Sequence, residues 1–279
     1  MFVGHYSVAF ACRTERNKIP LWVLFIAVQF LDYIWATLVL LGIEKLRVTK
    51  GFTAGSMLDS YFHPYSHSLI TAVIWSAVAA FVYKTVCSRH PFDSAQGRLS
   101  HYNKSAPLII GLAVFSHWIL DLIAHPRDLA IYDNRWKVGF GLWNYRDPEF
   151  ALEIALLAGG IVLFLARNTM PAIRKGAVIA FGLVLVIVQI GDTYVPRTPL
   201  TDKTTVTGVW VFYTLFVLLA FTSPLPLHLS LPLSLSLSLS LLSSLSPLFV
   251  FSLSLLTLTL LSLSLYLSLS QHNKSTWKN

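Results

Sequence analysis

Residues 106–125 read APLIIGLAVFSHWILDLIAH, an apolar run about as long as the roughly 20-residue helix that crosses a lipid bilayer. Three ionisable side chains interrupt the run at spacings of four residues: His117, Asp121 and His125. Because positions four apart share one face of an α-helix, these side chains form a polar stripe on an otherwise apolar helix. The stretch therefore predicts a membrane-spanning helix that carries a polar site.

Five other apolar runs have a similar length and are bounded by Lys, Arg, Pro or Gly, as spanning helices commonly are. They cover roughly residues 20–42, 67–87, 149–167 and 175–195, with a last span that begins near Gly208. A shorter apolar stretch at the start, MFVGHYSVAFAC, predicts a short helix or a half-membrane insertion. The pattern predicts an all-α fold, a polytopic transmembrane helical bundle of about six spans.

The composition agrees with a multi-pass integral membrane protein. Of the 279 residues, 55% are hydrophobic and only 12% are charged, whereas soluble domains have about 25% charged residues. The net charge of +8 comes from Lys and Arg scattered through the connections between apolar runs, which indicates membrane flanks and not a nucleic-acid surface. Cys12 and Cys87 lie far apart and indicate neither a disulfide framework nor a metal motif.

The composition changes abruptly after residue 222. We therefore divide the chain into a transmembrane helical domain, residues 1–222, and a low-complexity Leu/Ser-rich tail, residues 223–279. Strict Leu/Ser alternation has the period of a strand, and low complexity of this kind rarely builds a packed core. A CT dinucleotide repeat also reads as alternating Leu and Ser codons, so the tail is open to a second interpretation as a gene-model artefact. We assign it no function.

Ionisable side chains inside apolar spans are costly, by roughly 2.5 to 3.5 kcal/mol on insertion scales, and indicate function by default. Asp32 lies in the middle of the first strong span, and His67 begins the second. Because successive spans run in opposite directions, many of the polar residues are expected near one leaflet, with His117 and Asp32 deeper. The residues expected near that leaflet are His63, His67, Asp121, His125, Glu149, Glu153 and Asp192.

Imidazole and carboxylate groups are ligands that suit zinc, iron and manganese, and three protein ligands with one open position make a catalytic metal site. On this interpretation His67, His117 and Asp121 are the predicted ligands, and Asp32 is a further ligand or orients a histidine. A spare carboxylate or histidine would act as general base. Simpler alternatives remain: a single histidine can serve as hydrogen-bonded glue between helices, and Glu149 can compensate a helix dipole.

Several segments together resemble an uncharacterised family of bacterial multi-pass membrane proteins, which is similar to the group labelled membrane-bound metal-dependent hydrolases. The segments are FVGHYSVAFA, AVQFLDYIWATLVLLGIEKLRV, YSHSLITAVIW, FSHWILDLIAHPRDL and KVGFGLWN, and the resemblance covers about residues 2–220. The polar positions that it implies are His5, Asp32, His67, His117, Asp121 and His125. It adds His5 to the predicted metal ligands and gives Asp32 and His125 catalytic roles.

The sequence thus predicts an integral membrane protein with a His/Asp site for a divalent metal ion such as zinc. The expected activity is hydrolysis of a lipid or another amphiphilic ester or phosphoester, with the lipid bilayer as partner and no nucleic acid. No phosphate-binding Gly-rich loop, nucleophile elbow or HExxH motif occurs. The alternatives are a proton- or ion-coupled transporter that uses the same polar groups, and a structural membrane protein without catalysis.

Overall fold

The computed structural model describes residues 1–89, 104–195 and 201–222, so the predicted Leu/Ser tail lies outside the described residues. Residues Met1–Tyr213 form one compact unit, and the second unit, Thr214–Asn279, is described only as far as residue 222.

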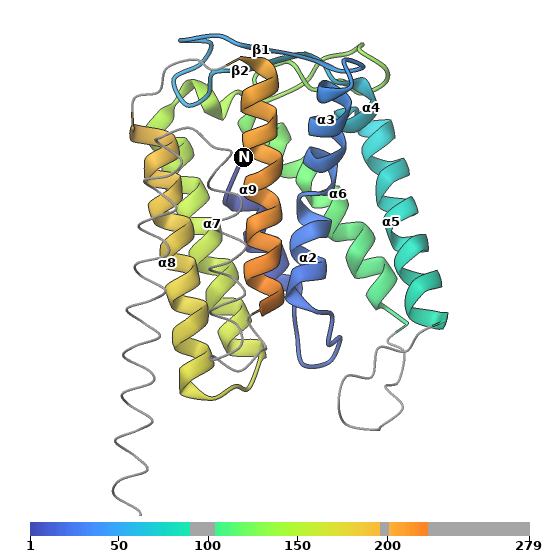
Figure 1. The fold of residues 1–279 in the computed structure, drawn as a ribbon, viewed down its shortest axis with the longest axis vertical. Coiled ribbons are helices and arrows are strands. Elements are labelled where there is room, and N and C mark those ends of the chain that lie inside the picture. Colours follow the sequence, from blue (N-terminus) through green and yellow to red (C-terminus); the bar gives the residue numbers. More distant parts are fainter. Residues whose placement is uncertain (90–103, 196–200, 223–279) are drawn as a thin grey trace, which may run out of the picture. The chain divides into compact units, whose positions relative to one another are not determined.

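Helices dominate the described residues, and the prediction of an all-α helical bundle is confirmed (Figure 1). The α-helices are α1 (Gly4–Cys12), α2 (Leu21–Val28), α3 (Phe30–Leu40), α4 (Pro64–His67), α5 (Leu69–Arg89), α6 (Ala106–Ala124), α7 (Arg146–Arg167), α8 (Ala172–Tyr194) and α9 (Asp202–Thr222). Among the described residues, α5 to α9 are each long and apolar enough to cross a membrane. The first apolar stretch forms α1, a helix of nine residues.

The expected single helix over residues 20–42 is wrong in one respect, because the structure breaks it at Gln29. The axes of α2 and α3 differ by 53°, and the Gln29 backbone has φ −107° and ψ 9°. A broken helix leaves backbone carbonyls without partners in the helix. Here the Val28 carbonyl accepts a hydrogen bond from His117 Nδ1 at 2.7 Å, so the break supplies a contact to the polar stripe of α6.

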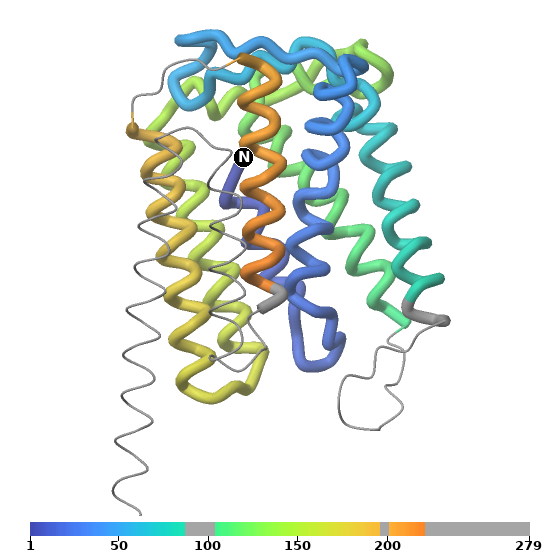
Figure 2. The backbone as a smooth tube through the Cα atoms, viewed as in Figure 1, coloured from blue at the N-terminus to red at the C-terminus, as the bar shows by residue number. Residues whose placement is uncertain are grey.

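Helix α1 lies inside the bundle and packs closely against α7, as the path of the N-terminal residues in Figure 2 shows. Close approach is allowed by Gly160, where a Cβ atom would overlap the backbone of Ser7. The carboxylate of Glu153 accepts hydrogen bonds from the amides of Phe2 and Gly4, both at 2.7 Å. The bond to Gly4 satisfies an amide that the first turn of a helix otherwise leaves free, and the bond to Phe2 fixes the residue just before the N-cap. Helix α7 therefore holds α1, and His5 with it, in place.

Two connections lie across the same end of the helices (Figure 1). The first holds an antiparallel hairpin of β1 (Lys45–Val48) and β2 (Leu58–Phe62), in which Arg47 pairs with Asp59. The second joins α6 to α7 through a short 3-10 helix, η1 (Leu142–Asn144). This second connection turns tightly at Gly139, whose φ of +152° brings its backbone against Pro126, so that a Cβ atom would overlap the Pro126 carbonyl.

The packing of α1 on α7 gives a test with a matched control, because two neighbouring glycines of α7 differ in their surroundings. A Cβ atom at Gly160 would collide with Ser7, whereas a Cβ atom at Gly159 would meet nothing within 4 Å. We expect Gly160→Ala to lower the free energy of unfolding by about 1–3 kcal/mol through overpacking. Gly159→Ala should leave it unchanged or slightly raised. Thermal unfolding in detergent measures both, and equal midpoints for the two variants would contradict this account of the packing.

Candidate metal centre

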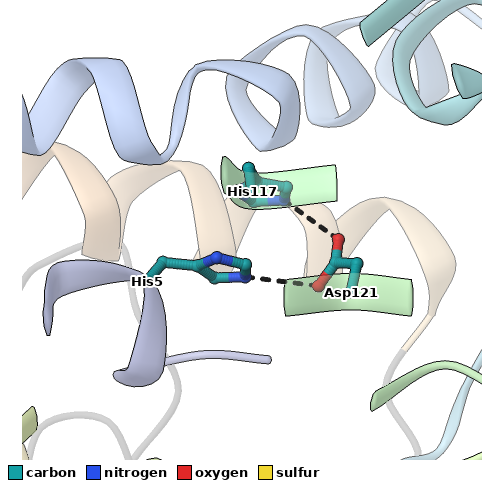
Figure 3. Close-up of side chains that lie close together, drawn as sticks. All are labelled: His5, His117 and Asp121. Carbon is teal, nitrogen blue, oxygen red and sulfur yellow. Dashed lines mark ion pairs between the residues drawn. The ribbon is translucent and has the colours of Figure 1, made fainter. Parts of the chain in front are cut away.

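Five of the predicted polar side chains converge inside the first unit although they come from four different helices. His5 belongs to α1, Asp32 to α3, His67 to α4, and His117 and Asp121 to α6. They form two overlapping groups that share His117, and within each group the ligand atoms all lie within 4.8 Å of one another. The groups are His5 with His117 and Asp121, drawn in Figure 3, and Asp32 with His67 and His117.

The carboxylate of Asp121 stands at the centre of this cluster. Its Oδ2 lies 3.1 Å from His117 Nε2 and 3.6 Å from His67 Nε2. Its Oδ1 lies 3.2 Å from His5 Nε2 and accepts a hydrogen bond of 2.8 Å from the Met1 amino group. The Asp121 side chain is only 3% exposed, so solvent contributes little to balancing its charge.

The hydrogen bond of His117 to the Val28 carbonyl fixes which ring nitrogen carries the proton. A carbonyl oxygen can only accept, so Nδ1 carries a proton, and in the neutral ring Nε2 presents a lone pair. That lone pair faces Asp121 Oδ2 at 3.1 Å and Asp32 Oδ1 at 3.5 Å. Within the described residues, His117 Nε2 makes no hydrogen bond. A bare nitrogen that faces two carboxylate oxygens requires positive charge between them, from a proton or from a metal ion.

A second hydrogen-bond chain orients His67 in the same way. The Ser66 hydroxyl donates to Glu44 Oε2 at 2.7 Å, so it accepts from His67 Nδ1 at 2.8 Å, because it has only one proton. His67 Nε2 is then directed at Asp32 Oδ1, 3.3 Å away. Glu44 is buried and its Oε1 also accepts the amides of Tyr65 and Ser66. Burial raises the pKa of Glu44, and these donors oppose the rise by favouring the charged form.

The donor set and its surroundings fit a metal ion. Imidazole nitrogens and carboxylate oxygens are the ligands that zinc and other first-row transition metals accept in proteins. Metal-binding histidines usually donate their other ring N–H to a carbonyl or a carboxylate-linked group, as His117 and His67 do here. Asp32 is held by the Tyr213 hydroxyl, which donates to its Oδ2 at 2.7 Å and leaves Oδ1 facing both imidazoles.

His125 lies next to the cluster and forms a pair with Asp128. Its Nδ1 is 3.0 Å from Asp128 Oδ1, and its Nε2 is 3.9 Å from Asp121 Oδ2. The ring packs against Trp143, with centroids 4.0 Å apart. A histidine whose Nδ1–H is bound by a carboxylate is held in one orientation and presents Nε2 as a base.

Not every polar residue expected near this leaflet joins the cluster. Glu153 instead caps α1 through the amides of Phe2 and Gly4, and Glu149 is buried beside it in the first turn of α7. His63 is buried near His67 and His125, with ring centroids 5.6 Å and 6.3 Å away. Whether His5, Asp32, His67, His117, Asp121 and His125 bind or act on anything stays a prediction.

Sequence reasoning missed four supporting residues: Glu44, Ser66, Asp128 and Tyr213. Ser66 could have been suspected because it directly precedes His67, and Asp128 because it follows His125 by three residues. Glu44 and Tyr213 carry no such signal, since their partners lie 22 and 181 residues away along the chain.

Comparisons of the chain with models of known families, with curated proteins and with solved structures find no match.

The Ser66 chain can be tested apart from the ligands themselves. Removing the hydroxyl in Ser66→Ala would leave His67 without its fixed orientation, and loss of such an outer contact typically weakens metal binding about 10- to 100-fold. Ser68→Ala is the matched control, because the Ser68 hydroxyl is hydrogen-bonded to Thr71 instead. Zinc affinity measured against a competing chelator distinguishes the two variants. Equal affinities would show that this chain does not orient a ligand.

Proposed function

We propose that the protein is a membrane-embedded, metal-dependent hydrolase that acts on a lipid or another amphiphilic ester or phosphoester. One observation is the main support for a metal site. The Nδ1 atoms of His117 and His67 are each engaged in a separate hydrogen bond, so in the neutral rings the Nε2 lone pair of His117 faces Asp121 and that of His67 faces Asp32. Each hydrogen bond fixes one tautomer, and both point the bare nitrogen at the same small volume. Protonated histidines would also balance the charge, and metal content distinguishes the two.

We assign four residues as the ligands of one divalent ion, zinc being the simplest candidate: Asp32, His67, His117 and Asp121. His5 lies on the far oxygen of Asp121, and its ring stacks on that of His117 with centroids 3.8 Å apart. Its role is to support both neighbours or to add a ligand through the shared carboxylate. When bound, such an ion supplies Lewis-acid chemistry that polarises an ester or phosphoester and makes water a stronger acid near neutral pH.

We assign the proton transfers of the reaction to His125. Held by Asp128 through Nδ1, it presents Nε2 toward Asp121 and can take a proton from an attacking water and return it to the leaving group. Its neighbour Trp143 limits the motion of the ring. Long apolar helices and a site near one end of the bundle support a substrate that enters from the lipid bilayer.

The metal site is tested first by elemental analysis of the full chain purified in detergent. We expect near-stoichiometric zinc, manganese or iron in the wild type and its loss in Asp121→Asn, which keeps the shape of the side chain but removes its charge. Asp133→Asn is the control, because Asp133 lies on an exposed turn away from the cluster, with its side chain 49% exposed. A folded wild-type protein without any metal would contradict the proposal.

If His125 acts as the general base, a mutation that disturbs it should slow hydrolysis without reducing the amount of bound metal. Asp128→Asn removes the charge that orients the imidazole, so we expect hydrolysis of an amphiphilic ester or phosphoester to fall by about 10²- to 10⁴-fold while bound metal stays at the wild-type level. The measurement is product release together with metal content on the same sample. Loss of metal in this variant would instead place Asp128 among the groups that support the ligands.

A metal or proton transporter is the second candidate, favoured by the break between α2 and α3. Discontinuous helices whose free backbone groups face a polar site are typical of secondary transporters, and the Val28 carbonyl is such a group. Flux of metal or protons into proteoliposomes, without hydrolysis of any lipid present, would support the transporter and reject the hydrolase. A structural protein would show neither metal nor flux.

A further inference from the structure

A cavity opens beside the metal-centre cluster, within the first unit. It contains about 470 Å³ of empty space, including its open mouth. Ser60 and His63 join the cluster on its polar side, while its apolar wall includes Trp35, Leu58, Trp143 and Val209. A polar end beside an apolar wall suits a ligand that has a polar head and a hydrocarbon chain.

His63 is the unexplained polar group of this cavity. It is 3% exposed, and neither ring nitrogen makes a hydrogen bond of ordinary geometry within the described residues, although the Ser60 backbone approaches it. A histidine ring has at least one N–H donor whether it is neutral or protonated, so His63 offers the cavity a donor. A buried polar group without a partner is unfavourable, and a ligand that accepts a hydrogen bond from it would remove that cost.

Lys137 adds positive charge to the same region. This half-buried side chain reaches the hairpin, with its ammonium 3.4 Å from the Tyr61 carbonyl, and it lies near enough to act electrostatically on His63. The carboxylates closest to it are engaged elsewhere: Asp59 pairs with Arg47 at 3.5 Å, and Asp128 pairs with His125 at 3.0 Å. Asp32 and Asp121 also line the cavity and would repel an anion, so the His63 donor and the Lys137 charge favour an anionic ligand when a bound metal ion offsets these two carboxylates.

We propose that the cavity binds the phosphoryl head group of an amphiphile, with the His63 N–H donating to its oxygens, the nearby Lys137 ammonium attracting its negative charge, and the apolar wall contacting its chain. This inference rests on the proposed function and narrows its substrate class from esters in general to phosphate esters. A neutral carboxylic ester would use the apolar wall but would leave the Lys137 charge without a role. His63 is thereby a substrate-binding residue and not a metal ligand.

The experiment measures binding of decylphosphonate and of inorganic phosphate to the full chain, loaded with zinc in maltoside micelles, by titration calorimetry, with metal content determined on the same samples. We expect decylphosphonate to bind more tightly than inorganic phosphate. His63→Ala should weaken decylphosphonate binding about tenfold or more at unchanged metal content, and His63→Gln, which keeps a neutral N–H donor, should recover part of the loss. Lys137→Met should weaken binding and reduce its salt dependence, whereas the control Lys50→Met, on an exposed turn, should do neither.

Each other result rejects a distinct statement. Unchanged affinity in His63→Ala overturns the inference while the metal centre stands. Loss of metal in His63→Ala overturns it by making His63 a ligand. Equal affinity for inorganic phosphate and decylphosphonate overturns the inference that the ligand is an amphiphile and indicates a site for soluble phosphate. A wild-type protein that takes up no zinc overturns the proposed function, and this inference with it.

Discussion

The buried carboxylate of Asp121 imposes the constraint on which the rest of the site depends. An ionised carboxylate inside a helical bundle is costly unless positive charge and hydrogen-bond donors surround it. Here the surrounding groups come from distant parts of the chain: the Met1 amino group and His5 from one side, His67 and His117 from the other. Elements that lie far apart along the chain must therefore meet at one point.

Two irregular features of the fold make that meeting possible. Helix α1 is only nine residues long, and it reaches the interior because Gly160 lets α7 approach its backbone and Glu153 caps its first turn. The break at Gln29 turns α3 away from the line of α2 and frees the Val28 carbonyl for His117. In regular, uninterrupted helices the same polar side chains would lie apart from one another. The short helix α1 and the break at Gln29 therefore bring these polar side chains together.

Residues that are not candidate ligands set the orientation of the two imidazoles in the cluster. His117 and His67 differ from ordinary buried histidines because their Nδ1 protons are already engaged, by a backbone carbonyl and by the Ser66 hydroxyl. The Ser66 hydroxyl is in turn held by Glu44, at the end of the connection that follows α3. This arrangement fixes the orientation of both imidazole rings within the protein itself, which is the kind of preorganisation that a metal site requires.

The sequence by itself determined the class of fold and the stripe of α6, because hydrophobic length and a spacing of four residues are local properties. It also indicated Asp32 and His67 as unusual, since ionisable groups in apolar runs are costly wherever they fold. It could not show that Glu153 caps α1, that the first strong span bends at Gln29, or that Glu44 and Tyr213 hold the site, because each depends on partners far away along the chain. Only the tertiary structure decided which lone pairs face which oxygens, since that follows from hydrogen bonds that form after the helices have packed.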